Sequence, residues 1–382
     1  MTTATTLDRI RRDRAGESHY ATLQDLAGEL VRLQATKRDD VVDTRRMSFA
    51  TTEGESFLTF DSSDPRDDGT AGGPVNDYAH GQLADHLDVP KRYYDRLRVQ
   101  APGLLDQNVL HWLHNPVRRD GKPAPATRMV RMLDGRVRAL LSNSFRRLDN
   151  FDLMERSILP ALQDVDGLTF QVGALTPERM TIRALLPSLE REIRTGDVVQ
   201  AGVQIRNSEV GAGKLEVAPF VWRLVCLNGM VLPAQGLSAI HLGARVTDDE
   251  ATRRIFARDT LRADDVAFFL KARDAVKAAI TETQFELIVD QLRAATTGET
   301  IDQPVEATRS LTATFDLTEE EGGSILAQLA SGGDLSRWGM ANAVTAAAKQ
   351  ADSFDRQHDL ESLGWKVATM PAGDWQRIAV AA

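Results

Sequence analysis

The stretch that decides the fold runs from residue 127 to residue 141 and reads TRMVRMLDGRVRALL. Two runs of alternating side chains flank Asp134-Gly135, a dipeptide typical of two-residue hairpin turns, in which both central residues need a positive φ. Because strand side chains alternate between faces, we predict a β-hairpin with one apolar face. That face carries Val130, Met132, Val137, Ala139 and Leu141.

The opposite face of this hairpin carries Arg131, Arg136 and Arg138. A two-residue turn would set Arg131 directly across from Arg138, and like charges in that position destabilise a sheet. The pair therefore indicates a bound anion, a buried carboxylate or open solvent. A solvated face with carboxylates nearby explains it as well as a bound anion does.

Composition limits the class of protein. The 382 residues leave room for two or three domains or one large one, and 42% of them are hydrophobic, enough for a sizeable core. No apolar run approaches the length of a membrane span, and the first residues lack the apolar segment of a signal peptide. The single cysteine, Cys226, excludes an internal disulfide framework, so we expect a cytoplasmic protein.

Charge is distributed unevenly along the chain. Residues 117–147 hold nine lysines and arginines against two aspartates, a net charge of +7, whereas the whole chain carries −9 and the remainder therefore −16. A basic stripe on an acidic protein is a candidate footprint for a polyanion. It is equally a candidate to dock an acidic segment of the same chain.

The order of predicted elements indicates an α+β fold. We expect an antiparallel sheet with packed helices and a helical C-terminal third. Residues 61–76, rich in Asp, Gly and Ser, are typical of a mobile loop. The predicted divisions are an N-terminal helical extension at 1–40, an α+β core domain at 41–250 and a helical C-terminal region at 251–382.

Residues 80–97, HGQLADHLDVPKRYYDRL, have the pattern of two short helices around a turn. The pattern fits a DNA-binding helix-turn-helix. It also fits a pair of packed helices that carry Tyr93, Tyr94 and Leu97 into a core. Asp88 occupies the position in which a glycine would favour the turn.

Several predicted strands and turns end in polar clusters. Asn and Asp at such ends usually satisfy turn backbone, but Glu209 and Asp149 are also candidates to bind a divalent ion or to pair with nearby arginines. The candidate polar cluster is Asp149, Asn150, Asn207, Ser208, Glu209 and Asn228.

Other motifs carry little chemistry. GAGK at 211–214 lacks the first glycine of a phosphate-binding loop, and Leu215 follows its lysine where a magnesium ligand is needed. The histidines are scattered without metal-binding spacing. Cys226 lies in an apolar run and is predicted to be a small buried side chain, although a nucleophile pair with His241 stays open.

Four blocks of this sequence resemble a known family, the phage/plasmid-like proteins with domain of unknown function 932. The blocks are LADHLDVPKRYYDRL, VRALLSNSFRRLDNFDL, GDVVQAGVQIRNSEVGAGKLEV followed by RLVCLNGM, and WGMANAVTAAAKQ. They extend over roughly residues 45–365. The resemblance implies a cytoplasmic protein of a mobile element, and it implies no activity and no catalytic residues.

We therefore expect a non-enzymatic DNA-binding protein that serves recombination or single-strand annealing, without a cofactor, metal ion or membrane. Single-stranded DNA is the favoured partner, with aromatics such as Phe145 and Trp222 as candidates to stack bases. A homo-oligomer is compatible with this role. Alternatives are a metal-dependent nuclease or phosphotransferase that uses Glu209, Asp149 and Asp197, and a protein that binds a host factor. The candidate nucleic-acid-binding residues are Arg131, Arg136, Arg138, Arg146, Arg147, Arg206, Lys214 and Arg223.

Overall fold

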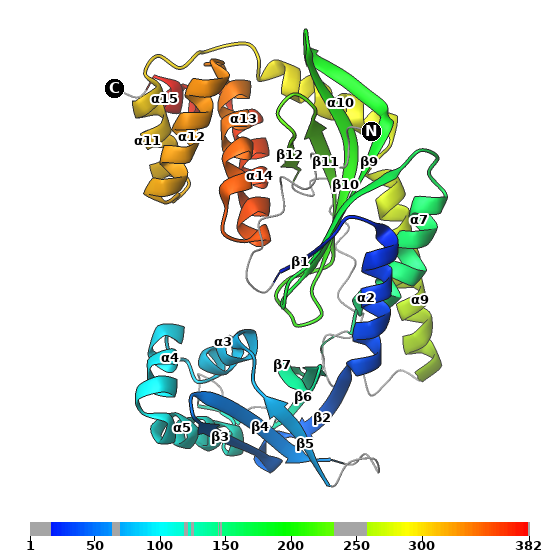
Figure 1. Cartoon of the computed structure of the whole chain (residues 1–382), viewed down its shortest axis with the longest axis vertical. Helices are drawn as coiled ribbons and strands as arrows, with labels where there is room; N and C mark the ends of the chain where they lie inside the picture. Colours follow the sequence, from blue (N-terminus) through cyan, green and yellow to red (C-terminus); the bar gives the residue numbers. More distant parts are fainter. Residues whose placement is uncertain are drawn as a thin grey trace.

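The computed structural model describes residues 17–62, 69–117, 121–123, 126–143, 145, 147–232 and 258–380. The chain forms two lobes and a helical bundle (Figure 1). We call residues 38–142 the insert lobe, because residues 17–36 lie with the later part of the chain. We call residues 17–36, 147–232 and 258–294 the sheet lobe, and residues 304–380 the C-terminal bundle.

The insert lobe holds two three-stranded antiparallel sheets, β2-β6-β7 and β3-β4-β5. Three helices cover them and share their apolar core, which includes Tyr94, Leu105 and Val109. The strands are β2 Arg38–Asp43, β3 Met47–Thr52, β4 Glu55–Asp61, β5 Thr70–Pro74, β6 Thr127–Leu133 and β7 Arg136–Ser142. A 3₁₀ turn spans Thr44–Arg46, and the helices are α3 Asp77–His86, α4 Lys91–Gln100 and α5 Pro102–His114.

The predicted hairpin is present as β6 and β7, and its turn residues Asp134 and Gly135 have φ values of 48° and 74°. Its register differs from the prediction. The pairing shifts between Arg131 and Met132, so Arg131 stands opposite Ala139 rather than Arg138. The shift also divides the predicted apolar face: Val130, Met132 and Val137 lie in the core of the insert lobe, whereas Ala139 and Leu141 lie with Met129 in a separate buried cluster. Arg131 and Arg138 are buried as well, so neither face of the hairpin is a solvated arginine surface.

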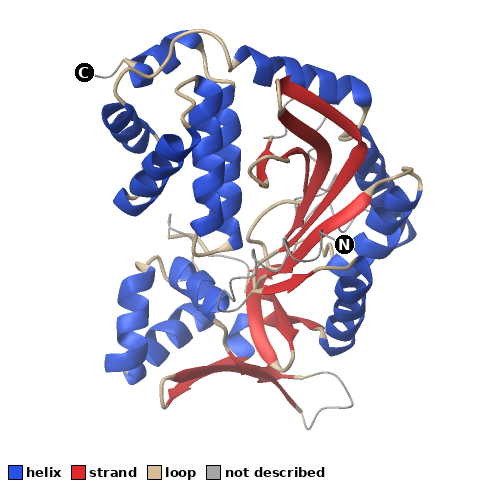
Figure 2. Ribbon diagram, turned by 45° about the horizontal axis from the view of Figure 1, so that its top comes forward, coloured by secondary structure: helices blue, strands red, loops and turns tan. Residues whose placement is uncertain are grey.

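The sheet lobe is built on six antiparallel strands in the order β1-β8-β9-β10-β11-β12. They curl into an open half-barrel (Figure 2). The strands are β1 Ser18–Tyr20, β8 Thr169–Leu175, β9 Met180–Arg194, β10 Asp197–Asn207, β11 Glu216–Arg223 and β12 Asn228–Val231. Its helices are α2 Leu23–Thr36, α6 Asn150–Leu153, α7 Leu159–Gln163, α9 Arg258–Ala278 and α10 Glu282–Ala294, with a π-helical turn at Met154–Ile158.

Side chains alternate between the two faces along the strands of this sheet, and helices cover the apolar face. Ile182, Ala184, Val203 and Ile205 point into an apolar core with α2 and α9. Arg183 and Gln204, one position away from these residues, point to the other face and meet α14. The sheet therefore has one apolar face and one face with a strongly polar centre.

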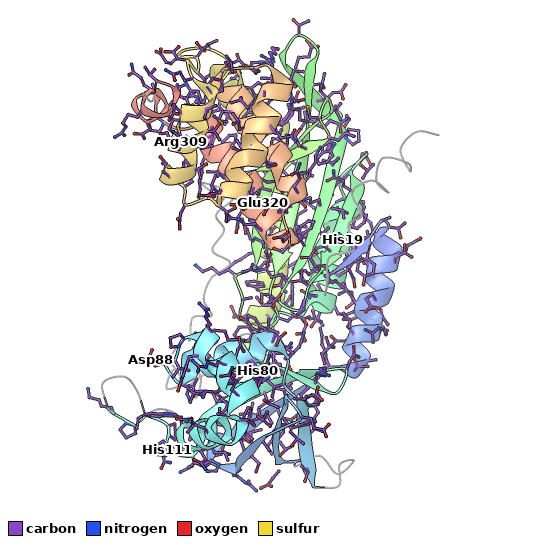
Figure 3. All side chains as sticks on the ribbon, turned by 60° about the vertical axis from the view of Figure 1, so that its left-hand side comes forward. His19, His80, Asp88, His111, Arg309 and Glu320 are labelled. Atoms are coloured by element: carbon purple, nitrogen blue, oxygen red, sulfur yellow. The ribbon has the colours of Figure 1, made fainter. Side chains whose placement is uncertain are left out.

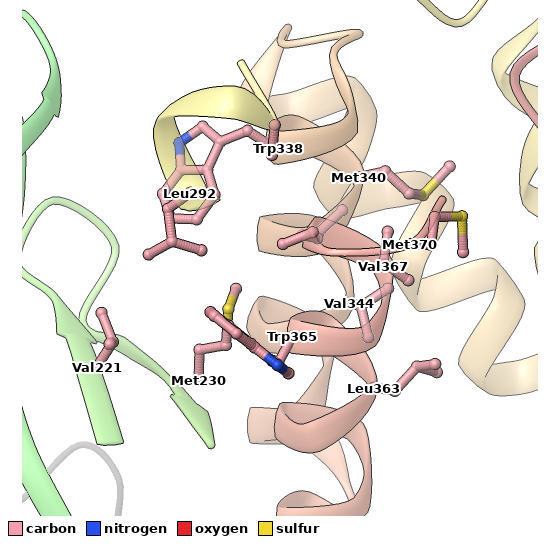
Figure 4. Packing of buried hydrophobic residues seen from close by; sticks show 14 of the residues in the cluster. Val221, Met230, Leu292, Trp338, Met340, Val344, Leu363, Trp365, Val367 and Met370 are labelled. Atoms are coloured by element: carbon pink, nitrogen blue, oxygen red, sulfur yellow. The ribbon is translucent and has the colours of Figure 1, made fainter. Parts of the chain in front are cut away.

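The C-terminal bundle packs on the far end of the sheet. Figure 4 shows Trp365 beside Met230 of the sheet and Trp338 beside Leu292, all in one buried cluster. Its helices are α11 Pro304–Thr314, α12 Glu319–Gly332, α13 Arg337–Ala347, α14 Phe354–Ala368 and α15 Ala372–Ala379, with a 3₁₀ turn at Ala348–Gln350. The predicted α+β class and helical C-terminal third are confirmed.

Two sequence predictions need correction. The predicted loop at 61–76 contains strand β5, which pairs with β4 through Phe57↔Pro74. Cys226 is exposed rather than buried, because β11 ends at Arg223 and the residues after it form a turn. Its suggested partner His241 lies outside the described residues.

The described part of the predicted N-terminal extension is integrated into the sheet lobe. Strand β1 pairs with β8, and Leu26 and Leu30 of α2 are fully or almost fully buried in the core under the sheet. Across the helices that the structure describes, none has the length and apolarity needed to span a membrane.

Candidate functional site at the lobe junction

The two lobes meet at a cluster of buried charges, which we call the junction network. It consists of Lys37, Asp39, Arg131, Arg138, Asp149, Asn150 and Glu209. These residues come from the end of α2, from β2, from both hairpin strands, from the start of α6 and from the loop after β10. The fold therefore brings together four segments that are far apart in the sequence.

Arg131 is the centre of the network and is completely buried. Its Nε donates to Asp39 Oδ1 at 2.8 Å, its Nη2 to Asp149 Oδ1 at 2.5 Å and its Nη1 to the backbone carbonyl of Glu209 at 2.6 Å. Burial alone would lower the pKa of Arg131, but Asp149 and Asp39 outweigh it and raise that pKa above its ordinary value. Arg131 is therefore a permanent cation held by two internal carboxylates.

Glu209 closes the network from the sheet lobe. It accepts hydrogen bonds from Lys37, from Arg138 Nη1 at 2.6 Å and from the backbone N–H of Asn150 at 2.6 Å. Burial works against the ionised form, yet Arg138, Lys37 and the Asn150 N–H together lower the pKa of Glu209 to about 2. The carboxylate is ionised at neutral pH.

This geometry corrects the role predicted for two hairpin arginines. Arg131 and Arg138 were expected to hold phosphates, and both guanidinium groups instead lie inside the protein against carboxylates. Of the three explanations open for the arginines, the buried carboxylate is the one that the structure contains. Arg138 Nε and Nη2 are buried without a hydrogen-bond partner.

The predicted polar cluster does assemble here, apart from one residue. Asn207 Nδ2 donates to Asn150 Oδ1 at 2.8 Å, and the Ser208 hydroxyl accepts from the N–H of Ala212 at 2.8 Å. Asn228 lies elsewhere, where it donates to the Thr345 hydroxyl of α13. The cluster orders the loop after β10 and thereby positions Glu209.

The predicted arginines beyond the hairpin pair with other parts of the chain. Arg206 is buried against Asp355 of α14. Arg223 Nε donates to Asp197 Oδ1 at 2.6 Å. Both guanidinium groups pair with carboxylates of the protein itself, so their expected phosphate contacts are not supported.

Three predicted cations remain on the surface, and one cannot be placed. Arg136 is half-exposed beside Glu55 at 2.6 Å, and Arg147 is half-exposed with Asp39 3.6 Å away. Lys214 is exposed. Arg146 lies outside the described residues.

The carboxylates proposed for a metal site do not meet in one cluster. Glu209 and Asp149 face cations in the junction network, whereas Asp197 accepts from Arg223 and from Trp338 Nε1 at 2.8 Å. Within the described ranges, no group of three or more His, Cys, Asp or Glu side chains could hold a metal ion.

The aromatics proposed to stack bases are engaged in packing. Phe145 lies against Met129, Leu141 and Val210. Trp222 lies beside Phe220, with ring centroids 6.0 Å apart.

The predicted helix pair is present as α3 and α4. Asp88 takes a φ of 56° in the turn, so it adopts the left-handed conformation for which glycine is usually selected. Tyr94 is fully buried, and its hydroxyl lies 3.0 Å from Nδ1 of His80. In Figure 3, His80 lies within the lobe and Asp88 at its edge.

The outer surface of α4 is basic, and sequence reasoning gave this too little weight. Arg92 and Arg96 are exposed and form no ion pair within the described residues, and Tyr93 is also exposed. The first turn of α4 has no acidic residue, and its N-cap, Pro90, gives no side-chain hydrogen bond. The signal was the run KRYYDRLR at 91–98, which carries four basic residues against one acid, Asp95.

No family model, curated protein or solved structure matches this chain. The resemblance to the phage/plasmid-like proteins therefore stays a prediction from the sequence.

Proposed function

We propose that this protein binds duplex DNA and that the N-terminal half of α4 is its principal contact. The observation that carries the proposal is the charge at the start of this helix. Lys91 and Arg92 open α4 where the helix dipole is positive; Lys91 is paired with Asp95 one turn later, whereas Arg92 has no ion pair within the described residues and costs stability there. A phosphate at this end would reverse that cost.

The backbone of α4 supports the same conclusion. A helix leaves its first N–H groups without intrahelical partners, and in α4 no N-cap side chain accepts from them. The N–H groups of Tyr93 and Tyr94 bond to the Pro90 carbonyl, which leaves those of Lys91 and Arg92. These two N–H groups, the helix dipole and the guanidinium of Arg92 together form a favourable site for a phosphate. In helix-turn-helix proteins the second helix lies in the major groove, with its N-terminal residues closest to the bases.

The proposed partner is duplex DNA, whereas the sequence led us to expect single-stranded DNA. That expectation depended on the hairpin arginines and on Phe145 and Trp222, which are engaged inside the protein. A helix pair suits a groove better than an unpaired strand. A role in recombination of mobile DNA rests on the sequence resemblance alone. A cytoplasmic location rests on that resemblance and on the single cysteine.

The test measures binding of fluorescent duplex and single-stranded DNA by anisotropy at several salt concentrations. Replacing both Arg92 and Arg96 with Gln should weaken duplex binding across unrelated sequences. It should also flatten the dependence of log affinity on log salt by roughly one to two units, because each lost phosphate contact removes about 0.9.

The matched control is Arg309→Gln, an exposed helical arginine in the C-terminal bundle that pairs with Glu306 (Figure 3). It should leave both affinity and salt dependence unchanged. Equal loss in the control and the α4 variant, or no DNA binding by the unaltered protein, would refute the proposal. Sedimentation of the protein alone and with DNA would test the expected homo-oligomer.

A further inference from the structure

A cavity of about 320 Å³ lies in the insert lobe between α3, α5 and the hairpin. Its polar walls are formed by Arg128 of β6 and by Gln82, Asp85 and His86 of α3. Its apolar walls are Leu83, Leu113 and Leu140. A pocket with a few polar groups among apolar side chains is the usual form of a small-molecule site.

Arg128 is a cation without a counter-ion in the part of the chain that the structure describes. Its Nη1 donates to the carbonyl of Thr127 at 3.3 Å, a long contact, and no carboxylate of a described residue pairs with it. Burial lowers the pKa of Arg128, which reflects the cost of a charge removed from water without compensation. The other arginines of this hairpin all have carboxylate partners.

A second basic group shares this cavity. His86 lies in the last turn of α3, and its pKa is lowered first by burial and then by the charge of Arg128. Asp85 also lines the cavity, but its side chain is exposed and forms no ion pair with Arg128. Both polar ends of Gln82 are already used, one by Leu140 N–H and one by the carbonyl of Val210.

We propose that this cavity binds a phosphomonoester, with the phosphate on Arg128 and His86 and the organic part against Leu83, Leu113 and Leu140. A phosphomonoester carries nearly two negative charges at neutral pH and offers several acceptor oxygens, which match one fixed cation beside one imidazole that can donate a hydrogen bond. The cavity is far larger than a phosphate ion, so it has room for a sugar or a base. This site is separate from the α4 surface.

A phosphomonoester has two sources, a free nucleotide and the terminal phosphate of a DNA strand. Titration calorimetry with adenosine monophosphate and with adenosine covers the first source. Anisotropy with a 5′-phosphorylated oligonucleotide and its 5′-hydroxyl counterpart covers the second. We expect the phosphorylated member of at least one pair to bind tenfold or more tightly, since hydrogen bonds to charged groups differ from neutral ones by about this factor.

Arg128→Gln should abolish that preference and keep the fold, because it removes an uncompensated charge. His86→Gln should reduce the preference severalfold and serves as the second variant should Arg128→Gln fail to fold. The Arg92→Gln, Arg96→Gln variant should leave the preference intact, which separates this proposal from DNA binding by α4. Equal binding of phosphorylated and dephosphorylated probes, or an unchanged preference in Arg128→Gln, would overturn the proposal.

Discussion

Replacing Glu209 with Gln tests the junction network most directly. The substitution keeps the size of the side chain and an acceptor for the Asn150 N–H, but it removes the negative charge. Lys37 and Arg138 would then be buried without their shared carboxylate, with exposed side-chain fractions of 7% and 8%.

The size of the effect follows from two independent estimates. Removing one partner of a buried ion pair costs about 3–5 kcal/mol because the remaining charge stays uncompensated. The pKa of Glu209, lowered from 4.5 to about 2, corresponds to about 3 kcal/mol at 1.36 kcal/mol per pKa unit. We therefore expect Glu209→Gln to lower the free energy of unfolding by about 3 kcal/mol at pH 7.

The same shift predicts a pH dependence. Glu209 has a lower pKa in the folded protein than in the unfolded chain, so the unfolded chain binds the proton first. Its stabilising contribution is fully present above pH 4.5 and is lost as the pH falls from 4.5 towards 2. The difference between the unaltered protein and Glu209→Gln should shrink over that range.

Urea unfolding followed by circular dichroism at pH 7 and at intervals down to pH 3 measures both effects. The control is Glu320→Gln, an exposed carboxylate at the start of α12, which should change stability by less than about 0.5 kcal/mol. If Glu209→Gln also changes the free energy of unfolding by less than about 0.5 kcal/mol at pH 7, the network adds nothing to stability and the reasoning is refuted.

Two further predictions concern single positions. Gly135→Val should lower the free energy of unfolding by about 1–2 kcal/mol, because φ is 74° there and a β-branched residue is strained in that region. The helical control Gly28→Ala should not destabilise, and an unchanged melting temperature in Gly135→Val would contradict the turn. Cys226 is exposed, so its rate of reaction with a thiol reagent in the native protein should be within about tenfold of the rate in the urea-unfolded chain. A native rate several hundredfold slower would contradict the structure. Cys226→Ser should leave the melting temperature unchanged.

The turn of the hairpin could be predicted because its cause is local. Asp134 and Gly135 both tolerate a positive φ. The alternation alone did not fix which side chains share a face, because Ala139 and Leu141 lie in a different cluster from Val130, Met132 and Val137. The register could not be predicted, because the shift beside Arg131 has no signal in the hairpin itself. It accompanies contacts with Asp39 and Asp149, which lie far away in the sequence.

The junction network was predicted in part for a similar reason. Glu209 and Asp149 were recognised as carboxylates that could pair with arginines, but the identity of the partners depends on how two lobes meet. Lys37 was missed because it looks like the ordinary basic end of a helix. The exposure of Cys226 was missed because an apolar run of residues continues past the end of β11 into a turn.

The insert lobe interrupts the sheet lobe, and this order has a consequence for synthesis of the chain. Strand β1 pairs with β8, which leaves the ribosome about 150 residues later, and Glu17 accepts from the N–H of Phe354 near the other end. Residues 17–36 therefore lack their partners while residues 38–142 are synthesised and form their own core. Lys37 stands at the entrance to that interval and pairs with Glu209 only after it. A stop after residue 142 and before β8 would leave the insert lobe with its own core and the N-terminal helix with its apolar side uncovered.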